Sequence, residues 1–351
     1  MIKMFDIFNL FWLYATNSRL RRDIKVFKYS TNLYAHYAWG LLEETSIAPI
    51  LKNPQTLDEI ADKGGVNNRV MLETLFDTLV GRNVLRFKNG EYHFNKKPTF
   101  SQKEYDYIAT HYPGAVKWSH FLYDRAKPCL LEGSNHVDTG FSDDNSLKLW
   151  DSILEGPLYA MRQLAITELT NSLKENAQVA DIGSGSGIAL VDILSKSDED
   201  IQLTGFDYSS KMLERSKERI GKFIKKSDSA LQQENAENVR LIRHNLLDDF
   251  PKEHKFDAVF ISLVINHISP EKREIVFDKI KSVMSPGATL VIFQLVNQSR
   301  FDRVFSDWLL HVVPSHQGFP VKDDYINMLS SKFNINKVAF RGNIIVAKNG
   351  R

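Results

Sequence analysis

The segment VADIGSGSGIAL at residues 179–190 constrains the fold more than any other part of the chain. An apolar strand leads to Asp181, after which Gly183, Gly185 and Gly187 open a turn into a helix. Glycine lets the backbone approach a ligand closely, and a helix N-terminus offers N–H groups to it. In a dinucleotide fingerprint the third glycine comes three positions after the second, whereas here it comes two after. The acid before the turn therefore favours a ligand with a positive ammonium group over a pyrophosphate.

Short apolar strands alternate with amphipathic helices from Ala177 onward, which is typical of a doubly wound parallel sheet. We expect strands at 178–182, 201–207, 239–244, 256–262, 288–294, 333–340 and 343–348. Only Arg341 and Gly342 separate the last two strands, and a parallel crossover needs about a dozen residues. The pattern predicts an α/β fold with a Rossmann-like seven-stranded sheet that closes in an antiparallel hairpin.

A second acid, Asp207, ends the strand that follows the glycine turn. At the C-terminal tip of that strand its carboxylate is placed to accept both ribose hydroxyls of a nucleoside. The alternative is that Asp207 caps the helix that follows, and the two roles are compatible. Asp207 is therefore a predicted ligand residue.

The stretch Asp207-Tyr208-Ser209-Ser210-Lys211-Met212-Leu213 resembles the second motif of class I S-adenosylmethionine (SAM)-dependent methyltransferases. PGATLVIFQ resembles the fifth strand of that family, and the final hairpin its closing strands. Asn245 stands where the family often has an aspartate that faces the adenine amino group, and an asparagine oxygen accepts the same hydrogen bond. The resemblance covers residues 175–351.

This resemblance implies SAM as the cofactor and S-adenosylhomocysteine as the product. It implies a set of cofactor-binding residues in the turn and at the strand ends: Asp181, Gly183, Gly185, Gly187, Asp207, Tyr208, Met212, Asn245, Leu246 and Ser262.

Residues 34–97 predict a winged helix-turn-helix unit. Thr56 and Glu59 have the spacing of a capping box, so a helix is expected at 57–63. A second helix is expected at 69–80, capped by Asn67 or Asn68. Its predicted buried face consists of Val70, Leu75, Phe76 and Leu79.

The wing of this unit is predicted at 83–95, where Asn89-Gly90 favours a type I′ hairpin turn. The second helix would enter DNA, but it carries Arg69 against Glu73 and Asp77, so its charge opposes phosphate. We therefore expect no nucleic-acid partner, and a scaffold that dimerises the enzyme.

With this unit in front, the whole chain resembles the dimeric small-molecule O-methyltransferases of secondary metabolism. The domains expected are a helical, winged-helix dimerisation domain at 1–100, a helical linker at 101–175 that contributes to the acceptor pocket, and a SAM-binding domain at 176–351. The partners implied are a homodimer mate and a small-molecule or peptide acceptor.

The family's general base is a histidine just after the fourth strand, which here points to His267, with Asn266 as the alternative occupant of that position. A phenol needs a base near neutral pH, and histidine has a suitable pKa. A carboxylate acceptor needs none. Both acceptor classes therefore stay open, including a peptide carboxyl group.

Aromatic and polar side chains of the helical segment are candidates for the acceptor pocket, with core packing as the ordinary alternative. The candidates are Trp118, His120, Trp150, Tyr159 and Met161.

Two further functions stay open beside O-methylation. One is a winged-helix regulator that binds SAM without turnover. The other is N- or C-methylation, which the same fold supports.

Composition excludes several other classes. The 45 basic and 43 acidic residues leave a formal charge of +2, which gives no whole-chain attraction to nucleic acid or anionic lipid. The single cysteine, Cys129, excludes an intramolecular disulfide and fits the cytoplasm. His111, His136 and His311 lack metal-ligand spacing, so no metal is expected.

The apolar first fifteen residues fall short of the roughly 20 that span a bilayer. We expect them to pack against a second copy of the chain rather than to insert in a membrane. A peripheral membrane helix is the alternative.

Overall fold

The computed structural model describes residues 18–133, 144–251 and 255–350. They divide into two compact units. The first holds the described residues up to 133 together with 148–160, and the second holds 144–147 and the described residues from 161 onward. The segment 101–175 is thus shared between the units. The predicted helix at the start of the chain lies outside the described residues.

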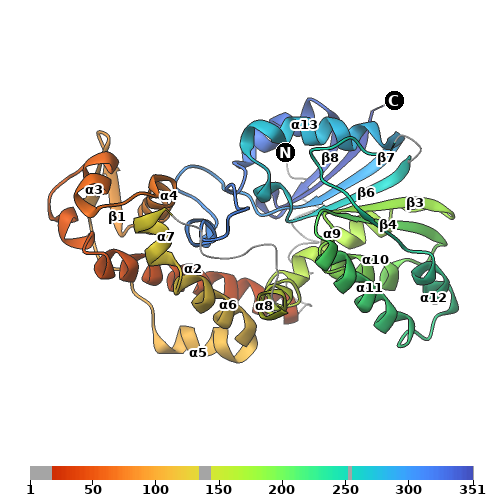
Figure 1. Cartoon of the computed structure of the whole chain (residues 1–351), viewed down its shortest axis with the longest axis horizontal. Coiled ribbons are helices and arrows are strands. Elements are labelled where there is room, and N and C mark those ends of the chain that lie inside the picture. The colour runs from red at the N-terminus through yellow and green to blue at the C-terminus, as the bar shows by residue number, and fades with distance from the viewer. Residues whose placement is uncertain (1–17, 134–143, 252–254, 351) are drawn as a thin grey trace. The chain divides into compact units, whose positions relative to one another are not determined.

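The second unit is built on a seven-stranded sheet with the order β5-β4-β3-β6-β7-β9-β8 (Figure 1). Its strands are β3 (Ala177–Ile182), β4 (Ile201–Asp207), β5 (Arg240–Arg243), β6 (Phe256–Ser262), β7 (Met284–Phe293), β8 (Phe333–Ala339) and β9 (Ile344–Asn349). The first five run parallel, and β9 pairs antiparallel with β7 and β8. This confirms the predicted fold class and its closing hairpin.

One strand boundary differs from the prediction by more than one residue. β7 begins at Met284, four residues before the predicted start, because Met284 pairs with Phe256 across a register shift in the neighbouring strand. Pairing with β6, which local sequence does not show, extends the strand through Pro286 and Gly287.

The central strands of the sheet are apolar and buried on both faces. Val179, Phe206 and Phe260 in β3, β4 and β6 are fully buried, as expected for central parallel strands. The helices of this unit are most of α9 (Tyr159–Thr170), α10 (Ile188–Lys196), α11 (Ser210–Ile224), α12 (Ala230–Glu237), α13 (Pro270–Ser282), α14 (Asp307–Leu310) and α15 (Lys322–Ser330). Figure 1 shows α13 on one face of the sheet and α10 and α11 on the other. Phe277 and Leu329 bring α13 and α15 into the core of one face.

The first unit is mostly helical, with a two-stranded hairpin. Its elements are α2 (Ser18–Glu44), α3 (Leu57–Gly64), α4 (Arg69–Gly81), β1 (Leu85–Lys88), β2 (Glu91–Phe94), α5 (Gln102–His111), α6 (Pro113–Tyr123), α7 (Ala126–Glu132) and most of α8 (Asp144–Leu154). Among the described residues, no helix combines the length and apolar character needed to cross a membrane.

Local signals in this unit act as predicted. Thr56 and Glu59 form a reciprocal capping box at α3, and Asn68 caps α4. Asn89 and Gly90 have φ of 54° and 84° between β1 and β2, as a type I′ turn requires. The order of helix, turn, helix and hairpin is the one expected for residues 34–97.

The prediction of the buried face of α4 was wrong at one residue. Leu75, Phe76 and Leu79 are fully buried, but Val70 is 62% exposed. At about 100° per residue, Val70 lies nine residues and half a turn away from Leu79. Met71 and Leu72 occupy the buried side of this first turn instead.

Candidate functional site

The glycine turn joins β3 to α10 at the carboxyl edge of the sheet. Gly183, Gly185 and Gly187 have φ of 73°, 54° and 78°, values at which a side chain is strained. The N–H of Gly183 donates to the carbonyl of Phe206 at 2.8 Å, which ties the turn to the end of β4. No side chain caps α10, so the N–H groups of its first turn remain for a ligand or water.

The three glycines serve different purposes. A Cβ at Gly183 would lie 2.3 Å from Cγ2 of Val264, and one at Gly187 would lie 2.6 Å from Oγ of Ser216. These two glycines allow close packing inside the protein. A Cβ at Gly185 would meet nothing within 4 Å, so the backbone is open to a ligand at this position.

Two acids flank the turn. Asp207 is nearly buried, and its carboxylate accepts the N–H groups of Gly185 and Ser209, each at 2.9 Å. Asp181 is 1% exposed, and neither of its carboxylate oxygens has a hydrogen-bond partner. A buried carboxylate without partners is costly, so this arrangement suits a ligand that supplies donors.

Burial raises the pKa of Asp181 to about 8, and the nearby carboxylate of Asp207 adds to the rise. Arg162 acts in the opposite direction, but its guanidinium is bound to Asp192 at 2.9 Å. Burial also raises the pKa of Asp207, while the N–H donors of Ser209 and Gly185 lower it. The site therefore favours a cationic ligand, which would let both acids ionise.

These residues fit the methionine and ribose ends of SAM. The unpartnered Asp181 oxygens match an ammonium group, and the open backbone at Gly185 leaves room for the ligand. Each Asp207 oxygen accepts one backbone N–H and keeps a lone pair for a ribose hydroxyl.

The other predicted cofactor residues lie around the same edge of the sheet. Tyr208 is 57% exposed directly after β4, whereas Met212 is buried in the first turn of α11. Asn245 is exposed after β5, and its oxygen accepts a backbone N–H two residues on. Leu246 is nearly buried, and Ser262 is the last residue of β6.

The two candidates for the base position separate in the structure. A positive φ of 57° at Leu263 turns the chain out of β6 into a short 3-10 helix, Ile265–His267. Asn266 is buried, and its side chain contacts Gln294 and His316. His267 instead places Nδ1 3.0 Å from Oγ of Ser315.

His267 is a weak base in this environment. Burial lowers its pKa to about 4, because a charged imidazole is poorly solvated there, and His316 adds to the effect. Its ring is therefore neutral at pH 7, but its low basicity gives little drive for taking a proton.

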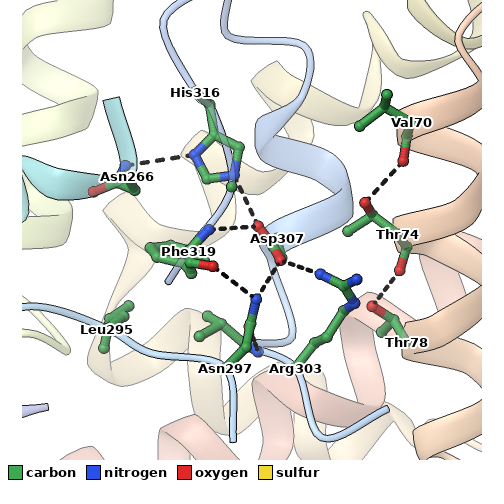
Figure 2. A network of polar contacts seen from close by, with 12 residues as sticks. Val70, Thr74, Thr78, Asn266, Leu295, Asn297, Arg303, Asp307, His316 and Phe319 are labelled. Carbon is green, nitrogen blue, oxygen red and sulfur yellow. Dashed lines mark hydrogen bonds and ion pairs between the residues drawn. The ribbon is translucent and has the colours of Figure 1, made fainter. Parts of the chain in front are cut away.

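The structure also brings together residues that sequence reasoning missed. Gln294 follows β7, Asp307 begins α14 and His316 lies in the loop after it, and all three are buried. Figure 2 shows His316 between Asn266 and Asp307. No local motif marks these residues, because they meet only through the return of the chain after β7.

Two histidines and an aspartate lie close enough together to be candidate metal ligands. Asp307, His311 and His316 each place one potential ligand atom within 4.8 Å of the others. Spacing along the sequence did not show this cluster. The absence of a metal stays a prediction.

The predicted acceptor-pocket residues do not form one cluster within a unit. Trp118, His120, Trp150 and Tyr159 belong to the first unit and Met161 to the second. Trp118 is buried, stacked on Phe121 and tilted against Trp150, as core residues are. The role of these five in acceptor binding stays a prediction.

The fold is that of the class I SAM-dependent methyltransferases, and SAM is the cofactor of this class. Residues 180–290 match the family model of the methyltransferase domain. The predicted resemblance is confirmed for this part of the chain.

A curated relative matches less than half of this chain. The carboxy-S-adenosyl-L-methionine synthase of Hydrogenovibrio crunogenus (strain DSM 25203 / XCL-2) is 27% identical over 158 residues, which are 44% of this chain and 58% of the relative. The chain therefore matches less than two thirds of that protein's length.

Solved structures share the fold along nearly the whole chain. The CurJ carbon methyltransferase has a TM-score of 0.70 at 14% identity, covering 98% of this chain and 96% of its own. An O-methyltransferase family 2 protein from Planctomyces limnophilus DSM 3776, in complex with apigenin, has a TM-score of 0.56 at 15% identity, covering 95% and 96%. Carbon and O-methyltransferases therefore share this fold, which leaves the acceptor atom open.

Proposed function

We propose that this chain transfers a methyl group from SAM to a small-molecule or peptide acceptor, with a hydroxyl or carboxyl oxygen as the first candidate for the acceptor atom. SAM supplies an electrophilic methyl group on a sulfonium. The protein must then hold the acceptor in line with that group, and such positioning alone contributes several kcal/mol.

One observation carries the proposal. Asp181 has two buried oxygens without hydrogen-bond partners just before the glycine turn. Asp207 ends the adjacent strand, two residues beyond Gly205, the partner of Asp181 in the sheet. A nucleoside with an ammonium-bearing tail fits both acids, whereas a pyrophosphate would be repelled by them.

Calorimetric titration with S-adenosylhomocysteine tests the cofactor site. We expect binding by the wild type and none measurable by Asp207→Ala, because the ribose loses its acceptor. Asp324→Ala is the matched control, because this acid is exposed on α15. The affinity of this variant for S-adenosylhomocysteine should equal that of the wild type. Tight binding of NAD with no binding of S-adenosylhomocysteine would contradict the proposal.

Two alternatives are separated by turnover. A carbon acceptor is favoured by the fold shared with carbon methyltransferases. A regulator that senses SAM is the other alternative. Incubation with labelled SAM and a panel of phenols, carbon acids, carboxylic acids and peptides distinguishes them, because a sensor binds SAM but never releases S-adenosylhomocysteine.

The N-terminal domain is proposed to form a cytoplasmic homodimer and to help wall the acceptor pocket. α4 supports a scaffold role rather than DNA binding, because Arg69 is engaged by Asp58 and Asp62, each at 2.5 Å. Light scattering of the intact chain and of a chain lacking residues 1–17 tests the dimer. We expect a dimer and a monomer, respectively.

A further inference from the structure

A line of polar side chains runs from the end of β7 to α14. Gln294 Nε2 donates to Asn266 Oδ1 at 3.1 Å, Asn266 Nδ2 lies 3.4 Å from His316 Nδ1, and His316 Nε2 lies 2.8 Å from Asp307 Oδ1. The exposed fractions of these four residues are 5% or less. In such a buried chain of hydrogen bonds, each amide and imidazole must turn a donor toward an acceptor. The orientation of one group therefore sets the orientation of the next.

The backbone fixes that direction. The N–H of Ile265 donates to Gln294 Oε1 at 3.0 Å, so the Gln294 amide nitrogen must face Asn266. The Asn266 oxygen is then used, and its nitrogen faces His316. Nδ1 of His316 is therefore the nitrogen without a proton, and Nε2–H donates to Asp307.

Asp307 is held as a carboxylate. Its Oδ2 accepts from Asn297 Nδ2 at 2.9 Å and from Arg303 at 3.1 Å, as Figure 2 shows. Burial raises the pKa of Asp307, but the hydrogen bond from His316 and the positive charge of Arg303 hold this pKa below its usual range. An ionised carboxylate on Nε2–H stabilises the imidazolium that forms when Nδ1 takes a proton.

The loop that carries His316 is fastened next to the end of β6. The N–H of Gln317 donates to the carbonyl of Asn266 at 2.7 Å. Arg273 donates to the carbonyls of Ile268 and Gly318 at 3.0 and 2.6 Å. These bonds hold Nδ1 of His316 beside the segment where the base was expected, at the same edge of the sheet as the glycine turn.

We propose that His316, oriented by Asp307, is the general base of this enzyme, and that the acceptor is one that must lose a proton: a hydroxyl or an acidic C–H group, not a carboxylate. The inference rests on the proposed methyltransferase function. The acceptor replaces the long contact from Asn266 at Nδ1. Its proton passes to Nδ1, its electron pair forms the bond to the methyl carbon, and the C–S bond breaks with its pair left on sulfur. The proton then leaves the imidazolium for solvent.

The charged surroundings favour a proton over a metal ion at this place. Among the residues that the structure describes, the titratable groups that interact with His316 are Asp307, His311 and His267. Arg303 binds Asp307, and Arg273 binds the carbonyl of Gly318 two residues after His316. Arg303 already neutralises Asp307, so a divalent cation would add two uncompensated charges to a buried site. A chelator separates the two readings.

The test uses the full chain with labelled SAM and three probes: apigenin for a hydroxyl, the N-acetylcysteamine thioester of acetoacetate for an acidic C–H, and benzoate for a carboxylate. We expect methylation of at least one of the first two and none of benzoate. His316→Gln should lower kcat by about a hundredfold or more and remove the rise of kcat/KM with pH. Its affinity for S-adenosylhomocysteine should match the wild type. His93→Gln is the control, since His93 lies in the hairpin of the first unit.

Undiminished turnover by His316→Gln overturns the proposal. So does methylation of benzoate alone, or of no probe, while S-adenosylhomocysteine still binds. Loss of activity with a chelator and its return with Zn²⁺ assigns the cluster to a metal instead. Failure of the wild type to bind S-adenosylhomocysteine refutes the methyltransferase function itself.

If His316→Gln does not fold, a measurement on the wild type that needs no turnover still tests the proposal. Long-range proton–nitrogen NMR of the wild type, with the His316 signal assigned, should show a proton on Nε2 and none on Nδ1 at pH 8. The opposite tautomer overturns the assignment of Nδ1 as the base.

Discussion

Asp181 and Asp207 belong to adjacent parallel strands, and the carboxylate of Asp207 makes Asp181 harder to ionise. Burial is the larger cause, and together they raise the pKa of Asp181 to about 8. This pair makes the predicted cofactor site sensitive to pH, and the direction of the effect follows from the raised pKa of Asp181.

The contribution of Asp181 to the stability of the ligand-free protein should fall as pH rises from about 4 to about 8. In this window Asp181 keeps its proton in the folded state, whereas an unfolded aspartate, with a pKa of about 3.9, has lost it. At this residue the folded state binds more protons, so its contribution to stability decreases as pH increases. His267, whose pKa burial lowers to about 4, acts in the opposite direction below pH 6.5. In thermal melts between pH 5 and 9, the stability of the wild type relative to Asp181→Asn should decrease with pH, because both proteins share the contribution of the histidines. Parallel curves would contradict the raised pKa.

Binding of S-adenosylhomocysteine should release a proton at pH 7. The ammonium group of the ligand stabilises the ionised form of Asp181 and so lowers its pKa. Calorimetry in phosphate and in Tris, which differ in ionisation enthalpy, should give different apparent enthalpies for the wild type. The difference should shrink in Asp181→Asn, and a wild type without any buffer dependence would speak against an ion pair.

Gly183→Ala should destabilise the fold more than a positive φ alone explains. Its Cβ would lie 2.3 Å from Cγ2 of Val264, whereas a Cβ at Gly287, with φ of 80°, meets nothing within 4 Å. Gly287→Ala should therefore cost only about 1–2 kcal/mol, the backbone term. Urea unfolding measures both. Val264→Ala in the Gly183→Ala background should recover part of the difference, and equal costs for the two alanines would exclude the steric account.

Gly185→Ala should weaken cofactor binding by far more than it weakens the fold. A Cβ there enters open space, so its stability cost should again be about 1–2 kcal/mol. Any ligand that lies against the turn would meet the new methyl group. We expect a more than tenfold loss of affinity for S-adenosylhomocysteine by calorimetry. Unchanged affinity would place the ligand elsewhere.

Val70→Ser should have almost no effect on stability, within about 0.5 kcal/mol, because Val70 is 62% exposed. Phe76→Ala on the same helix should cost about 3–5 kcal/mol, because Phe76 is fully buried. Chemical unfolding of both variants checks this. A large effect at Val70 would mean that its side chain is covered in solution, as it would be in an oligomer.

Local sequence predicted the elements that depend on neighbouring residues. The capping box at Thr56, the Asn89-Gly90 turn and the glycine turn after Asp181 all act within a few residues, so their chemistry is visible in the sequence. The wrong prediction for Val70 also came from local sequence, because the spacing of apolar residues was used to choose a helix face without knowing which side meets the core.

Only the tertiary structure could show that Asp181 lacks hydrogen-bond partners, or that Asn266 and His267 face different partners. These properties depend on which atoms surround a side chain, and residues far apart in the sequence supply those atoms.

The sequence by itself thus determined the class of fold and the identity of the two acids at the cofactor edge, because strand periodicity and turn chemistry are local. The meeting of Asn266, Gln294, Asp307 and His316 was decided by the packing of β6, β7 and the loop after α14. Hydrogen bonds between segments that are up to 50 residues apart define it, and no spacing along the chain encodes them.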